Sequence, residues 1–147
     1  MSNVHFVGGY RLESIRRRYP DLLYWINDDW QSTRAAYSFL LVDLAKQHNS
    51  LVSYSDVLFR RSLATSLCSS QADICVAVDS HWRTRYAGRT EADLQRCEKV
   101  SLHKDVITRL GADIPDALAF AEFVGCVHFG PKALASVSYT HLRAHET

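Results

Sequence analysis

Short apolar runs alternate with amphipathic stretches along the first half of the chain. The apolar runs have the length of strands and occupy residues 4–7, 22–26, 51–54 and 74–78. Between them, apolar side chains recur at spacings of three and four, as on one face of a helix. These amphipathic stretches cover residues 12–19, 35–47 and 57–67. Alternation of this kind favours a mostly parallel sheet with right-handed crossovers. The pattern therefore predicts an α/β fold.

The pattern changes after residue 79. Two short strand-like runs at residues 99–102 and 105–110 flank a polar turn, and we expect them to form a hairpin. Residues 122–129 form another apolar run, and Pro131 suits the first position of a helix. We see no repeat or linker, so we expect one domain over residues 1–136.

The last residues of the chain, 137–147, resemble a translated sequencing adapter more than a natural element. Such scars are set aside when a fold is inferred. We therefore expect a non-native tail after a domain that is incomplete. The alternative is a genuine polar helix.

Composition narrows the class of protein. The chain has 17 Lys and Arg residues against 16 Asp and Glu residues, so no global field favours nucleic acid or an anionic membrane. No apolar run approaches the roughly 20 residues that span a bilayer, and the start lacks the features of a secretion signal. The 4 cysteines form no CxxC pair, which is typical of reduced thiols. We expect a cytoplasmic protein without membrane insertion, and the sequence leaves its oligomeric state open.

Two aspartates directly follow predicted strands. Asp56 comes after the run that begins at Leu51, and Asp79 ends the run that begins at Ile74. Open α/β folds bind ligands at the carboxyl ends of their strands, and Mg²⁺ prefers oxygen ligands such as carboxylates. Both aspartates are therefore candidate metal ligands. The structural alternatives are an N-cap for Asp56 and a turn residue for Asp79.

An aromatic and basic segment, residues 82–91, follows the second of these strands. It contains Trp82, Arg85, Tyr86 and Arg89. Aromatic faces attract quaternary ammonium groups, and arginine forks bind phosphate oxygens. The segment would therefore suit a substrate such as phosphocholine. The alternative is a solvated basic loop that is anchored by one buried tryptophan.

Three further residues complete the candidate site. Lys99 is a candidate substrate ligand, with an ion pair at the surface as the alternative. Thr33 and Ser38 lie near the start of the predicted 35–47 helix and are candidate nucleotide ligands. Helix capping explains Thr33 equally well.

The order of these segments resembles a known superfamily. The matching stretches are Gly8-Gly9-Tyr10-Arg11, residues 24–33, Ser53-Tyr54-Ser55-Asp56, residues 76–79, residues 82–91 and Glu98-Lys99-Val100. Together they are similar to the sugar-nucleotidyltransferase-like superfamily. Within it they most resemble bacterial choline-phosphate cytidylyltransferases and the nucleotidyltransferase domain fused to phosphoenolpyruvate mutase-like proteins. The resemblance covers nearly all of residues 4–136.

The resemblance implies a Rossmann-like, mostly parallel sheet of the nucleotidyltransferase type, incomplete at both ends. It also implies Mg²⁺-dependent transfer of a nucleotidyl group, CMP from CTP, to a phosphorylated small molecule. Asp56 matches the metal position of the family, which makes it the candidate catalytic residue. The implied partners are a nucleoside triphosphate and the phosphorylated acceptor.

The chain also departs from the family pattern. It has no counterpart of the glycine-rich loop that holds the triphosphate, and Arg34 stands where many relatives have Asn or Gly. The family's second metal-binding aspartate would lie beyond Ser136. We therefore expect the chain to be inactive by itself. The alternatives are a non-catalytic regulatory module that binds a nucleotide or another ligand, and a sugar-1-phosphate nucleotidyltransferase.

Overall fold

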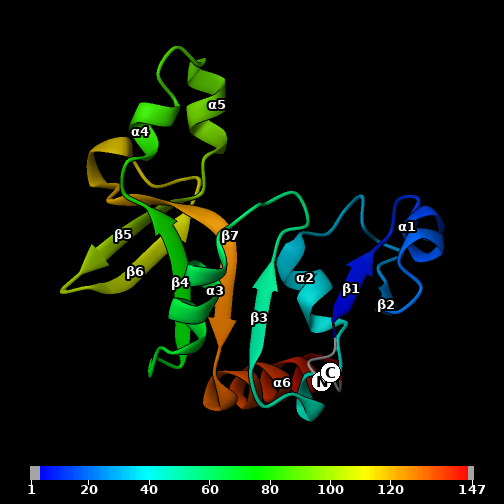
Figure 1. The fold of residues 1–147 in the computed structure, drawn as a ribbon. Coiled ribbons are helices and arrows are strands. Elements are labelled where there is room, and N and C mark those ends of the chain that lie inside the picture. The colour runs from blue at the N-terminus through cyan, green and yellow to red at the C-terminus, as the bar shows by residue number, and fades with distance from the viewer. Residues whose placement is uncertain (1–3, 146–147) are drawn as a thin grey trace. The chain divides into compact units, whose positions relative to one another are not determined.

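The computed structural model describes residues 4–145 and divides the chain into two compact units. One unit comprises the first 50 residues together with those from Phe129 onward, and the other comprises Leu51–His128. Figure 1 traces the helices and strands along the chain. Strands alternate with helices up to β4, and the first two strands are parallel, so the predicted α/β class is confirmed.

A parallel pair of strands lies at the centre of the first unit. β1 (His5–Gly8) pairs with β2 (Leu23–Ile26), in register from His5↔Leu23 to Gly8↔Ile26. Helix α1 (Leu12–Arg18) connects the two strands and buries Leu12. The unit is completed by α2 (Ala35–Leu40), the 3₁₀ helix η1 (Leu44–Lys46) and α6 (Pro131–His145). Phe39 of α2 stacks on Phe129 with ring centroids 4.7 Å apart.

The helix predicted over residues 35–47 is shorter than expected. α2 ends at Leu40, and η1 follows after Asp43, whose backbone leaves the helical region at φ −67° and ψ 84°. The Asp43 carboxylate pairs with Lys46 Nζ at 2.6 Å. Asp is among the weaker helix formers, which favours a break at this position.

A five-stranded sheet forms the second unit. Strand order is β3-β7-β5-β6, and β4 also pairs with β7. The elements are β3 (Ser50–Ser53), α3 (Arg61–Cys68), β4 (Ile74–Asp79), α4 (Trp82–Arg85), α5 (Glu91–Arg96), β5 (Lys99–His103), β6 (Val106–Gly111), η2 (Asp116–Leu118) and β7 (Ala121–Phe129). In Figure 1, β3 and β4 point one way and β7 points the other. The carboxyl ends of β3 and β4 therefore lie at the same edge as the start of β7.

The predicted hairpin is confirmed. β5 and β6 pair antiparallel from Lys99↔Gly111 to His103↔Val106. The turn consists of Lys104 and Asp105, which both have positive φ (48° and 64°). Two consecutive residues with positive φ are the signature of a tight turn that matches strand twist.

The helix predicted over residues 57–67 begins late. α3 starts at Arg61, and Arg60 before it is extended at φ −74° and ψ 148°. Val57 instead lies beside Gly125 of β7, where an added Cβ would come within 3.2 Å of it. Contact with the strand therefore takes precedence over an earlier helix start.

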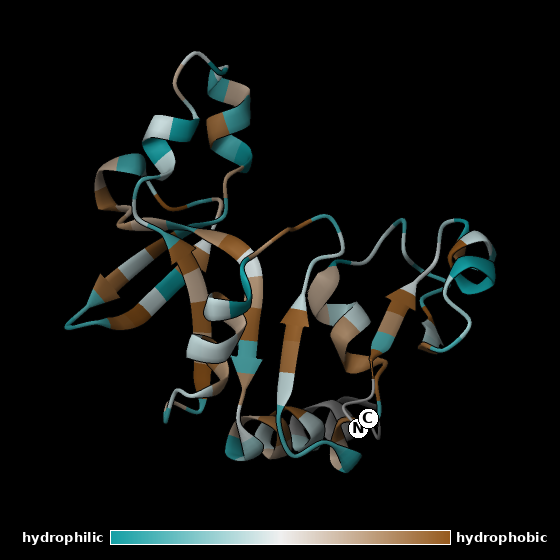
Figure 2. Cartoon of the chain, in the orientation of Figure 1, coloured by the Kyte–Doolittle hydropathy of each residue, from teal (hydrophilic) through white to brown (hydrophobic). Residues whose placement is uncertain are grey.

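Two apolar clusters stabilise the second unit. One joins Leu67 of α3, Ala77 of β4 and Cys126 of β7. The other surrounds Trp82 and joins it to Cys97, Ile114 and Ala119. Figure 2 shows apolar residues in brown along β3, β4 and β7. Burial of these side chains is the main stabilising term for the sheet.

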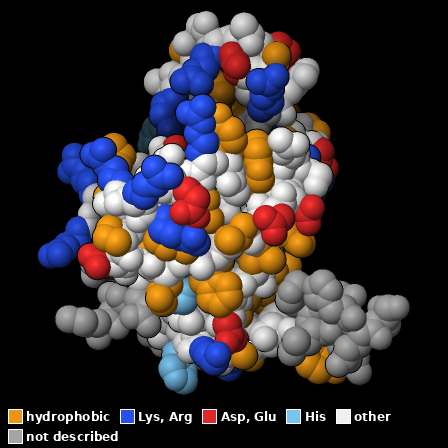
Figure 3. Space-filling model, turned by 90° about the vertical axis from the view of Figure 1, so that its right-hand side faces the viewer, with side chains coloured by type: hydrophobic (Ala, Val, Ile, Leu, Met, Phe, Trp, Pro, Cys, Tyr) orange, Lys and Arg blue, Asp and Glu red, His pale blue; other side chains and the backbone are white. Residues whose placement is uncertain are grey.

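The surface carries both signs of charge. On the face drawn in Figure 3, basic, acidic and apolar side chains are interspersed. Among the described residues, Leu58 is the most exposed of the large hydrophobic side chains. None of the helices within residues 4–145 is long and apolar enough to cross a membrane.

Helix α6 continues into the segment predicted to be adapter-derived. It covers residues 137–145 of that segment, and residues 146–147 lie outside the described part of the chain.

Candidate functional site

The candidate site of the second unit lies where β3 and β4 end and β7 begins. Tyr54 and Asp56 follow β3, Asp79 is the last residue of β4, and Glu122 is the second residue of β7. The Tyr54 N–H donates to the Gly125 carbonyl of β7 at 2.8 Å, which ties the end of β3 to β7.

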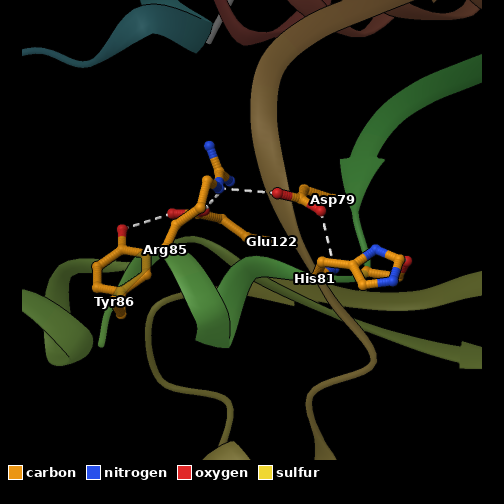
Figure 4. A network of polar contacts seen from close by, with 6 residues as sticks. Asp79, His81, Arg85, Tyr86 and Glu122 are labelled. Atoms are coloured by element: carbon orange, nitrogen blue, oxygen red, sulfur yellow. Dashed lines mark hydrogen bonds and ion pairs between the residues drawn. The ribbon is translucent and has the colours of Figure 1, made fainter.

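Arg85 of α4 lies between two carboxylates, one at each strand end (Figure 4). Its Nε is 2.8 Å from Asp79 Oδ2, and its Nη2 is 2.6 Å from Glu122 Oε2. The other Asp79 oxygen accepts the backbone N–H of His81 at 2.8 Å. The remaining Glu122 oxygen accepts the Tyr86 hydroxyl at 2.6 Å. One guanidinium thus fixes the ends of two strands and one helix to each other.

Glu122 is the most enclosed of the three ion-paired side chains in this network. Its side chain is 13% exposed, against 26% for Asp79 and 53% for Arg85. The hydrogen bond to Glu122 and burial raise the pKa of the Tyr86 phenol far above its usual value. Burial, together with the bond to Glu122, also raises the pKa of the Cys97 thiol to about 12. Cys97 is therefore a neutral structural thiol and no nucleophile at neutral pH.

A second polar pair lies beside Asp56. The Tyr54 hydroxyl donates to Glu98 Oε2 at 3.1 Å. Burial raises the pKa of Tyr54 to about 12, and the nearby charges of Glu98 and Asp56 add to the shift. The negative charges of Glu98 and Asp56 both disfavour ionisation of the Tyr54 phenol.

Asp56 has a free carboxylate, unlike Asp79. Its residue is exposed in a turn, and the described residues give its carboxylate neither a hydrogen bond nor an ion pair. The N-cap alternative does not apply, because α3 begins at Arg61 and its N-cap is Arg60. Mg²⁺ commonly takes one or two protein carboxylates and fills its other positions with phosphate oxygens and water. Asp56 fits that donor requirement.

Asp79 fits a metal ion less well. Both of its oxygens are engaged, one by Arg85 and one by the His81 N–H. Within the described chain there is no group of three or more His, Cys, Asp and Glu side chains arranged to hold a metal. A metal here would therefore rest on Asp56 and on ligand oxygens.

The segment at residues 82–91 is more ordered than the predicted loop. It contains one helical turn, α4, and the start of α5, which Thr90 caps in a reciprocal bond with Asp93. Trp82 is fully buried, so its ring packs in the core and is not open to a substrate in this structure. Arg89 lies over the Tyr86 ring, 5.1 Å from its centroid. Of the four residues predicted to bind substrate here, Arg85, Tyr86 and Arg89 lie together. The buried Trp82 ring meets the Tyr86 ring edge-on, with centroids 6.0 Å apart.

Lys99 is buried as well. Its Nζ pairs with Asp116 Oδ1 at 3.0 Å and donates to the Ala112 carbonyl at 3.3 Å. These contacts hold the segment between β6 and β7 in place. Lys99 therefore has a structural role here, and its ammonium group is not exposed to a substrate. The alternative was an ion pair at the surface. Lys99 does form an ion pair, with Asp116, but its ammonium group is buried.

Thr33 and Ser38 lie together in the first unit. Asn27 Nδ2 donates to Thr33 Oγ1 at 2.9 Å and to Ser38 Oγ at 3.0 Å. Thr33 Oγ1 in turn donates to the Asp29 carbonyl at 2.8 Å. Neither hydroxyl caps α2, whose N-cap is Arg34 without a side-chain bond.

Sequence reasoning did not foresee how two residues organise these sites. Glu122 was predicted only as part of a strand, and only its position opposite Arg85 distinguishes it. The segment Asn27-Asp28-Asp29 predicts a turn, with a ligand contact as the second role of Asn27, and its contacts with Thr33 and Ser38 depend on how the chain folds back after β2. A charged residue at the start of an otherwise apolar strand was the one available signal for Glu122.

The chain is similar to known proteins in sequence and in fold. No family model matches the chain. The chain is 21% identical to the CTP:phosphoglutamine cytidylyltransferase of Campylobacter jejuni over 148 aligned residues, which cover 93% of the chain and 58% of that protein. The solved structure of the inositol-1-phosphate CTP transferase from T. maritima matches with a TM-score of 0.61 and 17% identity, over 99% of the chain and 62% of that structure.

The chain has a nucleotidyltransferase-like fold. It spans less than two thirds of the length of either protein. The predicted Rossmann-like fold is therefore confirmed.

Proposed function

We propose that the protein containing this chain transfers CMP from CTP to a phosphorylated small molecule and releases pyrophosphate. An oxygen of the acceptor phosphate attacks the α-phosphorus, and the bond from that phosphorus to the bridging oxygen of the β-phosphate breaks. The observation that carries the proposal is the free, exposed carboxylate of Asp56 directly after β3. Similarity to two CTP-using transferases supports the choice of nucleotide.

Asp56 would hold Mg²⁺ in this reaction. The metal would offset the repulsion between the two anionic reactants, which is the main obstacle in phosphoryl chemistry. We propose that the more enclosed Asp79 instead orients Arg85, because its oxygens are already shared between Arg85 and His81.

Arg85, Tyr86 and Arg89 would receive the acceptor. Arg85 is half exposed, and Asp79 and Glu122 hold its guanidinium in one orientation. A pre-oriented guanidinium binds phosphate oxygens with a smaller entropy cost than a mobile one. Phosphocholine is the first acceptor to test, because the Tyr86 ring already accommodates a cation, Arg89.

The decisive experiment measures pyrophosphate release by the full protein with CTP, with and without Mg²⁺. The acceptors are phosphocholine, phosphoglutamine, inositol 1-phosphate and a sugar 1-phosphate. Asp56→Asn is expected to lower the rate at least about 100-fold, since metal charge stabilisation contributes several kcal/mol. Asp73→Asn is the matched control: Asp73 is an exposed aspartate just before β4, and its loss should leave the rate unchanged.

Two results would reject the proposal. Unchanged turnover in Asp56→Asn removes this carboxylate from the mechanism. CTP binding without pyrophosphate release for any acceptor favours the non-catalytic binding module instead. We expect the 147-residue chain alone to release no pyrophosphate under these conditions.

A further inference from the structure

Helix α4 is too short to hold itself in place. It has one turn of 4 residues, and its N-cap His81 forms no side-chain hydrogen bond with the helix. Isolated helices of this length do not persist in water, so contacts with the rest of the second unit must fix the helix. Burial of Trp82 is one such contact. Because apolar burial is non-directional, it fixes the depth of α4 in the core but does not by itself set the rotation of the helix.

Arg83 supplies directional contacts. Its Nη2 donates to the backbone carbonyl of Asp116 and, at 3.4 Å, to that of Ala119. Its guanidinium carbon lies over the Trp82 ring, 4.6 Å from the ring centroid. Hydrogen bonds depend on angle as well as on distance. These contacts therefore determine how α4 is turned about its own axis.

The segment that accepts these hydrogen bonds is itself held in place. Asp116 begins η2, and Ala119 follows this helix. Ala119 is buried in the same apolar cluster as Trp82. The Asp116 carboxylate pairs with Lys99 of β5 at 3.0 Å. Arg83 therefore joins α4 to a segment that is already fixed to the sheet.

Arg83 and Arg85 have separate partners. Side chains two positions apart do not share a face of a helix. Arg83 binds the carbonyls at η2, whereas Arg85 binds the carboxylates of Asp79 and Glu122 (Figure 4). A phosphate that binds Arg85 competes with these carboxylates, because all of them are anions. The contacts of Arg83 are with neutral carbonyls, so they do not depend on that competition.

We propose that Arg83 is a positioning residue for the acceptor. It holds α4 so that the guanidinium of Arg85 stays at the strand ends when the acceptor phosphate binds. The inference rests on the proposed function, in which Arg85 receives the acceptor. It deepens that function by assigning part of the acceptor affinity to a residue that does not contact the acceptor. Without Arg83, Arg85 loses its fixed orientation, and ordering it again on binding lowers the affinity.

The test is the steady-state kinetics of the full protein with Mg²⁺, CTP and phosphocholine, measured as pyrophosphate release. Arg83→Ala should raise the KM for phosphocholine about fivefold to tenfold, as expected when one flexible side chain has to be ordered on binding. The KM for CTP should stay the same, and kcat should change little. A merely structural role would lower kcat by reducing the folded fraction and would leave both KM values unchanged.

Two further variants sharpen the test. Arg83→Lys keeps a cation and a donor at this position, so it should restore part of the acceptor affinity. Arg96→Ala is the matched control, because Arg96 is an exposed arginine at the end of α5 whose side chain has no hydrogen bond or ion pair among the described residues. Its loss should leave both KM values unchanged. A KM for phosphocholine that is unchanged in both Arg83 variants overturns the inference.

A second measurement does not depend on turnover. Nη2 of Arg85 donates to Glu122 at 2.6 Å, so the NMR signals of its Nη groups report how firmly the guanidinium is held. Rotation of this guanidinium should be faster in Arg83→Ala than in the unmodified protein and unchanged in Arg96→Ala. Faster rotation, with no pyrophosphate release by the unmodified protein, would reject the proposed function and leave the positioning role intact. Release by the unmodified protein, with the KM and the rotation rate unchanged in Arg83→Ala, would keep the transferase and overturn the inference.

Discussion

The hydrogen bond between Tyr86 and Glu122 should be one of the strongest single contacts in the second unit. Its oxygen–oxygen distance of 2.6 Å is that of a bond to an ionised carboxylate, and the Glu122 side chain is only 13% exposed. Bonds to charged groups contribute about 1.5–3 kcal/mol. We therefore expect Tyr86→Phe to lower the free energy of unfolding of this unit by about 2 kcal/mol.

Amide hydrogen exchange in β7 measures this loss for the second unit alone. A change of about 2 kcal/mol corresponds to roughly 30-fold faster exchange where global opening governs it. In a double-mutant cycle with Glu122→Leu, the coupling energy should be about 1–2 kcal/mol. Tyr10→Phe is the control, because Tyr10 is exposed and belongs to the other unit. An exchange rate in Tyr86→Phe within threefold of the unmodified protein would refute the reasoning.

Two further predictions concern stability. The pKa of Tyr54 is raised to about 12 from 10.0, so its neutral phenol stabilises the fold below pH 10, and this contribution is lost as the pH rises from 10 to 12. In urea titrations, the loss of stability between pH 10 and pH 12 should therefore be smaller in Tyr54→Phe than in the unmodified protein. Equal losses in the two proteins would contradict this prediction. Gly125→Ala should lower the thermal midpoint more than Gly88→Ala. Both glycines have positive φ (75° and 80°), but a Cβ at Gly125 would lie 2.6 Å from Tyr54 Cδ2, whereas Gly88 has open space. Backbone strain costs about 1–3 kcal/mol at either position, and the clash adds to it only at Gly125, so equal shifts of the midpoint would show that the clash is relieved.

Local patterns were enough to predict most of the secondary structure. The strands at β1, β2, β3 and β4 fall within a residue or two of the apolar runs, and the hairpin of β5 and β6 falls where its turn residues indicated. Strand and hairpin signals depend on neighbouring residues alone, which a sequence displays directly. The helices were less certain, because Asp43 and Val57 form contacts that take precedence over helix periodicity.

The sequence placed Asp56 and Asp79 at strand ends, but it could not distinguish their surroundings. Within the part of the chain that the structure describes, Asp56 is left free, whereas Asp79 has both oxygens engaged, one by Arg85 of α4 and one by the His81 N–H. The tertiary structure also buries Trp82 and Lys99, which the sequence offered as candidate substrate ligands. Burial depends on which segments pack together, and no local pattern records that.

The same reason explains Glu122 and Asn27. Each became a candidate site residue only through partners distant in sequence or folded back upon it: Arg85 and Tyr86 for Glu122, Ser38 for Asn27. The sequence by itself determined the order of strands and helices and which residues lie at the strand ends, since both follow from periodicity and chain direction. The identity of the partners, and with it the charge and accessibility of each side chain, was decided by the packing of the chain in three dimensions.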